Sequence, residues 1–336
     1  MRINNINVQL SFSLIYRTTI EIIFSNLVTE GLPMNNILIL LISTSFLMTS
    51  CFNIPDDPNP GLIINHAALP DGHKVCVIGD SGKKSSGQAL VAKALLEENC
   101  DQIRHTGDII YPDGIKSADD PEFKSRFYDY YKPIMDKGVP FYMSVGNHDY
   151  KLEPEAWLEI AKKYETIKMP SMYYMDIYED ICFITFDTNS RYVEQKNWMD
   201  RIQKDYTSKC SFTLAFGHHP RYSSGKHGNA FLFVKKFLNA AVKGRVDTYI
   251  AGHEHNQEDY GMKDGTQWFV SGGAGEFRYI KGKPPVWAQA KLGYMIFTLH
   301  RDQKSPYMKY YFYRVHEETG VKTLEHYGAL RGMGFK

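Results

Sequence analysis

The sequence predicts an α/β protein built as a four-layer α/β/β/α sandwich. From residue 74 onward, short apolar runs alternate with stretches of helical periodicity, and the segment after residue 267 is rich in strand patterns. Mixed strand order with helices on the outer faces gives a layered arrangement of this kind. The chain has 336 residues, 43% of them apolar, and no internal linker or short-period repeat divides residues 72–336, so we expect one domain there.

The individual elements follow from local patterns. Apolar residues at three- and four-residue spacing predict helices over 86–98, 120–137, 154–164, 194–206 and 229–242. Asp119 and Asp120 precede Pro121, which is typical of a helix start. Apolar and β-branched runs predict strands over 74–78, 101–106, 139–145, 173–177, 181–186, 211–216, 246–251, 267–271, 294–300 and 307–315.

Five of these strands lead to a glycine followed by a side chain that can bind a metal ion. The pairs are Gly79-Asp80, Gly107-Asp108, Gly146-Asn147, Gly217-His218 and Gly252-His253, with Tyr111 and His255 shortly after two of them. A single Gly-Asp turn is ordinarily just a turn with a local hydrogen bond. Open α/β sheets carry their chemistry at the carboxyl ends of strands, so five such turns are expected to converge on one site.

The candidate ligands are carboxylates, an amide, a phenol and imidazoles, with no thiolate. This set suits hard or borderline ions such as Fe, Mn or Zn and argues against a structural cysteine-type zinc site. It is also too large for one ion, and it would fill two coordination shells if Asp108 bridged them. The predicted ligands are Asp80, Asp108, Tyr111, Asn147, His218, His253 and His255. Paired metal ions are typical of hydrolytic phosphate chemistry.

In their order, the motifs Gly-Asp-x-Gly, Gly-Asp-x-x-Tyr, Gly-Asn-His-Asp, Gly-His-x-Pro and Gly-His-x-His resemble those of the calcineurin-like metallophosphoesterases. Tyr111 narrows the resemblance, which spans about residues 72–330, to the purple acid phosphatases. The resemblance implies a first metal ion, expected to be Fe(III), on Asp80, Tyr111 and His255. It implies a second ion, a divalent Fe, Zn or Mn, on Asn147, His218 and His253, with Asp108 bridging the two.

The resemblance also implies two catalytic histidines. His148 would be an acid or a phosphate contact, and His227 would contact the substrate. Three positions depart from the usual purple phosphatase pattern, because Ser81 replaces Trp, His219 replaces Tyr and Glu254 replaces Asp. None of the three is expected to be a ligand. They are expected to line or support the pocket, so they bear on the substrate more than on the chemistry.

The function implied by the resemblance is hydrolysis of small phosphate monoesters, with a metal-bridging hydroxide as the nucleophile and an acid phosphatase-like pH profile. The same centre would also serve a phosphodiesterase or nucleotidase, since loops around Ser81, His219 and residues 275–291 select the substrate. A third alternative is a surface lipoprotein that binds a partner or metal without turnover, but His148 beside the ligands argues against it. Because 39 basic and 38 acidic residues give a net charge of +1, no nucleic acid partner is expected. The oligomeric state is left open.

The amino-terminal residues look like an export signal. Residues 37–48 form an apolar run too short to span a membrane and of the length of a signal-peptide core. Small residues before Cys51 resemble a bacterial lipobox, so residues 1–50 are expected to be a signal region, with Met34 as the true start and Cys51 as the lipid-bearing residue. Residues 51–71 would then be a tether. We expect a membrane-anchored protein facing the periplasm or cell surface, with an uncleaved anchor or plain secretory signal as alternatives.

Cysteines and loop cations are less informative. Cys76, Cys100, Cys182 and Cys210 allow three disulfide pairings or none. Residues 277–287, which include several cations, are expected to be either part of the pocket wall or a solvated loop.

Overall fold

The computed structural model describes residues 61–65, 67–284, 286–302 and 306–332. The chain divides into two compact units, residues 1–56 and 57–336, and the described residues all belong to the second. The predicted signal region and Cys51 therefore lie outside the described residues. None of the helices within the described part combines the length and apolarity needed to span a bilayer.

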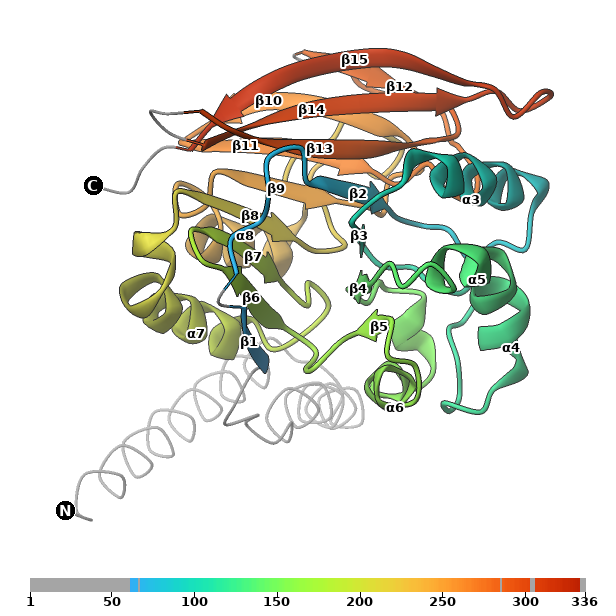
Figure 1. The fold of residues 1–336 in the computed structure, drawn as a ribbon, viewed down its shortest axis with the longest axis horizontal. Coiled ribbons are helices and arrows are strands. Elements are labelled where there is room, and N and C mark those ends of the chain that lie inside the picture. Colours follow the sequence, from blue (N-terminus) through green and yellow to red (C-terminus); the bar gives the residue numbers. More distant parts are fainter. Residues whose placement is uncertain (1–60, 66, 285, 303–305, 333–336) are drawn as a thin grey trace, which may run out of the picture. The chain divides into compact units, whose positions relative to one another are not determined.

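Two β-sheets lie face to face in this unit (Figure 1). The eight-stranded sheet has the order β1-β6-β7-β8-β9-β11-β10-β12, and the seven-stranded sheet has the order β15-β14-β13-β2-β3-β4-β5. The first contains β1 (Gly61–Asn65), β6 (Tyr174–Tyr178), β7 (Ile181–Thr185), β8 (Phe212–Phe216), β9 (Thr248–Ala251), β10 (Gln257–Lys263), β11 (Thr266–Ser271) and β12 (Trp287–Gln289). The second contains β2 (Lys74–Ile78), β3 (Gln102–His105), β4 (Phe141–Met143), β5 (Ile167–Lys168), β13 (Gly293–Arg301), β14 (Pro306–Val315) and β15 (Lys322–Arg331).

Helices cover the outer faces of both sheets. On the right of Figure 1 lie α3 (Ser86–Glu98), α4 (Pro121–Phe123), α5 (Asp129–Met135) and α6 (Ala156–Lys163), beside the seven-stranded sheet. On the other side, beside the eight-stranded sheet, lie α7 (Tyr192–Asp205) and α8 (Leu232–Ala241). The four-layer α/β/β/α sandwich expected from the sequence is confirmed.

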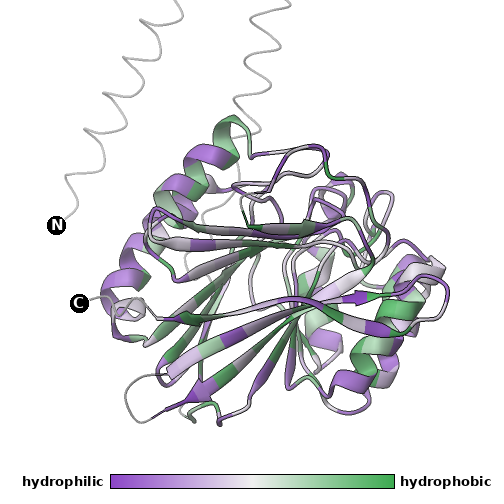
Figure 2. Ribbon diagram, turned by 90° about the horizontal axis from the view of Figure 1, so that it is seen from above, coloured by the Kyte–Doolittle hydropathy of each residue, from purple (hydrophilic) through white to green (hydrophobic). Residues whose placement is uncertain are grey.

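Apolar side chains form the core between these layers. One cluster fills the space between the sheets and includes Val77 of β2, Phe216 of β8 and Phe297 of β13, each at most 1% exposed. A second cluster joins the sheets to the helices, where Cys76 and Val91 are buried. Figure 2 shows hydrophobic residues along the strands and hydrophilic residues on parts of the helices. Neighbouring strand residues thus face different layers, as the two-residue repeat of a strand requires.

One buried ion pair links the two sheets. Arg104 of β3 is 1% exposed and Asp176 of β6 is fully buried, and the guanidinium donates to both carboxylate oxygens at 2.8 and 2.6 Å. The guanidinium also lies over the rings of Tyr142 and Phe183, at 3.8 and 4.2 Å from their centroids. Burial raises the pKa of Asp176, and the positive charge of Arg104 opposes that rise. The pair is bidentate, which is the arrangement that best offsets the cost of removing two charges from water.

Some predicted boundaries were wrong. The tether was expected to reach residue 71, but residues 61–65 form β1, which pairs in parallel with β6. The helix expected over 120–137 starts as predicted, with Asp120 accepting from the amide of Glu122 at 3.0 Å, but a π-helical stretch, Lys124–Tyr128, separates α4 from α5. The strands β1, β5, β10, β12 and β15 were not predicted, because they are short, Gly-containing or rich in charged residues.

The cysteine pairing left open by the sequence is decided by the fold. Disulfides join Cys76 to Cys100 and Cys182 to Cys210, with Cα atoms 5.9 Å apart in each pair. Each bridge ties a central strand to the segment that precedes the next strand of the same sheet. Cross-links of this kind stabilise a fold mainly by restricting its unfolded chain.

Candidate metal centre

The five predicted turns converge where the strands end. Within the seven-stranded sheet β2, β3 and β4 are parallel, and within the eight-stranded sheet β8 and β9 are parallel. Their carboxyl ends lead to the predicted ligands. The backbone φ angle is 58° at Asp80, 50° at Asp108 and 70° at His253, a region that few residues other than glycine adopt. Such backbone strain concentrates at functional sites.

The glycines that precede the ligands allow close packing of the site. A Cβ atom on Gly107 would lie 2.8 Å from Nδ1 of His218, and one on Gly252 would lie 2.5 Å from Oδ2 of Asp80. A larger residue at either position would displace a neighbouring predicted ligand. The glycines in the motifs are therefore explained by the packing of the site itself.

In one half of the site, three other predicted ligands surround the hydroxyl of Tyr111. Its hydroxyl oxygen lies 2.9 Å from Oδ1 of Asp80, 2.8 Å from Oδ2 of Asp108 and 3.0 Å from Nε2 of His255. All four side chains are at most 4% exposed. One phenolic proton cannot serve two carboxylates and an imidazole together, because a hydroxyl donates a single hydrogen bond.

In the other half of the site, predicted ligands surround Nε2 of His218. Its Nδ1 lies 3.0 Å from the carbonyl oxygen of Thr106, which makes Nδ1 the protonated nitrogen and leaves Nε2 facing the site. Nε2 lies 3.0 Å from Oδ1 of Asn147, 3.4 Å from Oδ1 of Asp108 and 3.2 Å from Nδ1 of His253. Nε2 thus lies among other atoms that can bind a cation. Asp108 reaches both halves, with Oδ2 near Tyr111 and Oδ1 near His218.

The pKa values of these side chains are shifted because the side chains are buried close together. Burial raises the pKa of Asp80 to about 8, and the charge of Asp108 adds to that rise. Burial opposes protonation of His218, but Asp108 and Asp80 outweigh it and raise the pKa of His218 to about 9. Burial also acts against ionisation of Asp108, yet His218 holds the pKa of that carboxyl well below its usual range. Asp108 and His218 thus stabilise each other's charged forms.

The donors fit a pair of metal ions. Ligating atoms of Asp80, Asp108 and His218 lie within 4.8 Å of one another, as do those of His218, His219 and His253. A cation near Tyr111 would remove the competition for its single proton, and a cation near Nε2 of His218 would be held by the oxygen and nitrogen atoms around it. Oxygen and imidazole donors without thiolate suit iron, manganese or zinc. All seven predicted ligands lie together, and their individual assignments remain predictions.

A family model described as calcineurin-like phosphoesterase matches residues 73–257. The chain belongs to this family. The match spans more than half of the chain and covers all five motifs, so the resemblance stated from the sequence is confirmed at the level of the family.

The curated relatives of this calcineurin-like phosphoesterase are purple acid phosphatases. The chain is 27% identical over 243 residues to "Purple acid phosphatase 4" of Arabidopsis thaliana. The alignment covers 63% of this chain and 71% of that protein. It is 28% identical over 201 residues to "Tartrate-resistant acid phosphatase type 5" of Oryctolagus cuniculus. That alignment covers 52% of this chain and 61% of that protein. These matches confirm the narrower resemblance to the purple acid phosphatases.

Solved structures show the same fold. Purple acid phosphatase PPD1 from yellow lupin (Lupinus luteus) seeds has a TM-score of 0.61 at 15% identity, over 79% of this chain and 55% of that one. GAP50, the anchor in the inner membrane complex of Plasmodium, has a TM-score of 0.64 at 20% identity, over 78% of this chain and 89% of that one. At these identities the likeness concerns the fold alone.

The two predicted catalytic histidines border the centre of this phosphoesterase. The amide of His148 donates to Oδ1 of Asp108 at 2.8 Å, and its ring lies 4.3 Å from that of Tyr111. Nδ1 of His148 contacts the carbonyl oxygen of Pro112, and the side chain is 25% exposed. The ring of His227 lies 4.7 Å from that of His253, and its side chain is 40% exposed. Both rings are therefore accessible to a substrate.

The three departures from the family pattern occupy distinct places. Ser81 is buried and its hydroxyl lies 2.9 Å from Nε2 of His105. His219 has Nδ1 2.8 Å from the hydroxyl of Thr188, and its ring is 4.6 Å from that of His253. His219 was expected to line or support the pocket and not to be a ligand, yet the structure groups it with two predicted ligands.

Glu254, the third departure, supports the loop that carries His227. Its Oε1 accepts from the amides of His227 and Gly228 at 2.6 and 2.7 Å, and its Oε2 lies 3.5 Å from Nδ1 of His227. The carboxyl group is 1% exposed. Glu254 therefore holds the loop of His227, a candidate substrate contact, in place. This agrees with the supporting role expected for it.

Sequence reasoning missed two acidic residues that organise the site. Glu276 has Oε1 2.8 Å from Nδ1 of His255, and it lies in a loop with no motif of its own. Asp149 accepts from the amides of Gly146 and Ile109 at 2.8 and 3.1 Å, so it fastens the third turn to the second. Asp149 belongs to the Gly-Asn-His-Asp motif, which could have identified it. For Glu276 no sequence signal exists.

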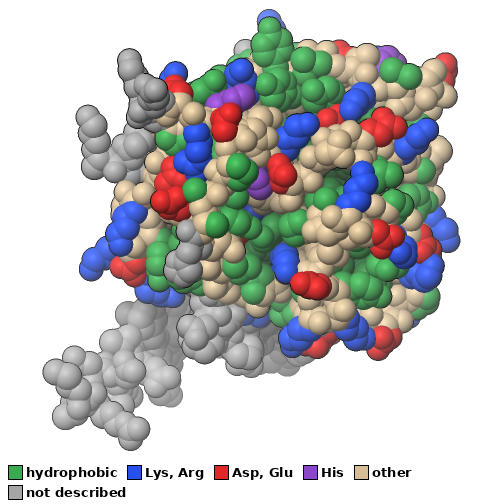
Figure 3. Space-filling model, in the orientation of Figure 1, with side chains coloured by type: hydrophobic (Ala, Val, Ile, Leu, Met, Phe, Trp, Pro, Cys, Tyr) green, Lys and Arg blue, Asp and Glu red, His purple; other side chains and the backbone are tan. Residues whose placement is uncertain are grey.

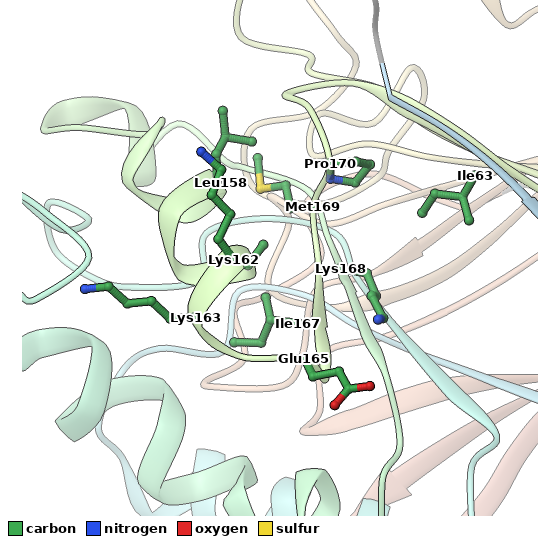
Figure 4. A pocket seen from close by; sticks show the side chains of 10 residues that line it. Ile63, Leu158, Lys162, Lys163, Glu165, Ile167, Lys168, Met169 and Pro170 are labelled. Carbon is green, nitrogen blue, oxygen red and sulfur yellow. The ribbon is translucent and has the colours of Figure 1, made fainter.

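A cavity of about 560 Å³ lies away from the metal centre, between α6, β5 and Ile63 (Figure 4). Its lysines include Lys162, which pairs with Glu159, and Lys163, which pairs with Asp119. These are surface ion pairs, and among the described residues both clusters able to bind a metal lie at the strand ends instead. Cavity size therefore does not identify the functional site here.

Proposed function

We propose that this protein hydrolyses phosphate monoesters at a dinuclear metal centre. The observation that carries the proposal is the two-sided donor set. On one side the hydroxyl of Tyr111 lies at most 3.0 Å from ligand atoms of Asp80, Asp108 and His255. On the other side Nε2 of His218 lies beside Asn147 and His253. Asp108 contacts both sides. Purple acid phosphatases among the curated relatives support the same reaction class.

Each half of the donor set would hold one ion. Asp80, Tyr111 and His255 would bind Fe(III), and Asn147, His218 and His253 would bind a divalent Fe, Zn or Mn, with Asp108 shared. When bound, the two ions supply an acidified water and positive charge for the phosphoryl oxygens. A phenolate ligand is the reason to expect Fe(III) on the first side.

The chain's own residues would orient the ester and move protons. Because Nδ1 of His148 contacts the carbonyl of Pro112, its Nε2 would be the nitrogen that gives a proton to the leaving oxygen, from the imidazolium form of the ring. His227 would contact the phosphoryl group from the opposite wall. The ammonium of Lys83 lies 3.4 Å from the centre of the Tyr111 ring and 3.0 Å from Oε1 of Glu276, so an ion pair borders the site.

A visible absorption spectrum with metal analysis tests the centre. Phenolate bound to Fe(III) has a charge-transfer colour that zinc or manganese lacks. We expect a violet or pink protein with two metals per chain, and we expect Tyr111→Phe to bleach it. Tyr327→Phe is the control, because Tyr327 is 68% exposed on β15, away from the centre.

The outcomes separate the alternatives. A coloured protein that hydrolyses aryl monoesters with higher kcat/KM than the matching diesters supports the proposal. A colourless protein with two divalent metals and a preference for diesters would replace it by a phosphodiesterase. A protein without metal or turnover would be a binding protein, and the shared fold of GAP50 shows why the fold alone does not decide this question.

We further propose that the protein is exported to the periplasm or cell surface and is anchored there by a lipid on Cys51. Two disulfides support an oxidising location, because disulfides persist mainly outside the cytosol. Metabolic labelling with radioactive palmitate should mark the wild-type protein and not Cys51→Ser. Equal labelling of both, or a mature protein that begins elsewhere, would contradict the anchor.

A further inference from the structure

A second cavity, of about 280 Å³, opens directly beside the proposed metal centre. His227 and His253 line it together with Pro220, Phe231 and Val234. Its lining thus combines imidazoles at the proposed centre with apolar groups and the amide of Asn229. A substrate whose phosphate sat at the centre would therefore direct its alcohol portion into an apolar channel.

The apolar wall continues outside the cavity. Phe231, Leu232 and Phe233 are 76%, 53% and 69% exposed, although consecutive large apolar residues normally bury their side chains. Phe231 also stands at the position before the first residue of α8, where Ser, Asp or Asn would stabilise the helix, and it makes no capping hydrogen bond. The folding of α8 thus gives no reason for this sequence, whereas contact with an apolar ligand does.

The same rim is positively charged. Residues 219–236 contain Arg221, Lys226, Lys235 and Lys236, and residues 277–291 contain Arg278, Lys281, Lys283 and Lys291. Two of these cations are paired, Arg278 with Glu276 at 2.9 Å and Lys291 with Glu317 at 3.6 Å. The two segments meet where the carbonyl of Ser224 accepts from the amides of Lys281 and Gly282 at 2.9 and 2.8 Å. Elsewhere basic and acidic side chains are interspersed, as on the face in Figure 3. Basic side chains thus outnumber their acidic partners at this rim, which favours an anion.

We propose that the substrates are amphiphilic phosphate monoesters, each with a phosphate group and an apolar alcohol. The phosphate occupies the metal centre, and the hydrocarbon lies in the cavity and along Phe231 and Phe233, so that Phe231 determines specificity. This inference rests on the proposed monoesterase function. Polar alcohols of the same length would gain less from this wall, because their oxygens would lose water against its apolar side chains.

Alkyl phosphates of increasing length test the inference. Ethyl, butyl, hexyl and octyl phosphate have leaving alcohols of nearly equal acidity, so differences in kcat/KM report contact with the chain. Full burial of a methylene corresponds to about a fourfold gain, and burial on one side to about twofold. Hexyl phosphate should then exceed ethyl phosphate by roughly 15-fold in kcat/KM. The phosphate of a polyether alcohol as long as octanol should remain near ethyl phosphate.

Phe231→Ser should reduce the hexyl-to-ethyl ratio to below about fivefold, because the wall of the channel is lost. Phe231 is largely exposed, so folding should not suffer. Tyr327→Ser, which removes an equally exposed ring from β15, should keep the wild-type ratio. Calorimetric binding of hexylphosphonate and ethylphosphonate, which are not hydrolysed, should give the same ratio in affinity.

The results distinguish this inference from the proposed function. Turnover with no dependence on chain length, or a dependence that survives Phe231→Ser, overturns the inference and leaves the monoesterase intact. Chain-length-dependent binding of the phosphonates without turnover of any phosphate ester overturns the proposed function and leaves the apolar site. A rising kcat/KM that Phe231→Ser flattens supports both.

Discussion

The ion pair between Arg104 and Asp176 makes a stability prediction that does not depend on the metal centre. Asp176→Asn keeps the shape of the side chain but removes its charge. The guanidinium of Arg104 would stay 1% exposed, between aromatic rings, without a counter-charge. Removing one partner of a buried pair costs about 3–5 kcal/mol. A domain's total stability is only about 5–15 kcal/mol, so the change should be large.

The assay is equilibrium unfolding in urea with the disulfides intact, followed by tryptophan fluorescence and circular dichroism. Asp136→Asn is the control, because Asp136 pairs with Lys132 on the surface and such pairs contribute about 0–1 kcal/mol. Arg104→Met combined with Asp176→Leu should recover at least half of the loss, because no charge then remains buried. A loss below about 1 kcal/mol for Asp176→Asn would refute the reasoning, since burial of unpaired charge costs more.

Three further predictions concern the site and one helix. Asp108→Asn should reduce activity below about one-hundredth and lower the metal content, since even residues behind the ligands affect function 10- to 100-fold; a folded, active variant would remove Asp108 from the centre. Glu276→Gln should weaken metal affinity about 10- to 100-fold in chelator competition, because it frees the ring of His255; unchanged affinity would contradict that role. Asp120→Ala should cost about 1 kcal/mol at neutral pH by removing a helix cap. Backbone hydrogen bonds lower the pKa of Asp120 below 3.8, so its contribution is present above that value and is lost as the pH falls through the lowered pKa. Urea unfolding at neutral and strongly acidic pH should therefore show the difference between wild type and variant disappear in acid; a constant difference would contradict the charge-based cap.

Short-range patterns account for what the sequence predicted well. The bounds of α3 agree with the predicted 86–98, because Ser85 caps its first turn and Asn99 ends it in a left-handed conformation. The five motif strands and their turns were also found, since each depends on an apolar run followed by a glycine. A parallel arrangement of such strands then brings their carboxyl ends together, so even the composition of the site was predictable from the motifs.

Only the tertiary structure decided which distant residues meet. Glu276 reaches His255 because strand β11 returns to the site, and His219 joins His253 through the pairing of β8 with β9. The disulfide partners and the pair between Arg104 and Asp176 likewise depend on sheet order and register. Local patterns carry no information on such contacts, because their free energy is gained only when both sheets have assembled. The sequence by itself therefore determined the chemistry of the site, and the assembled sheets decided its supports and its apolar rim.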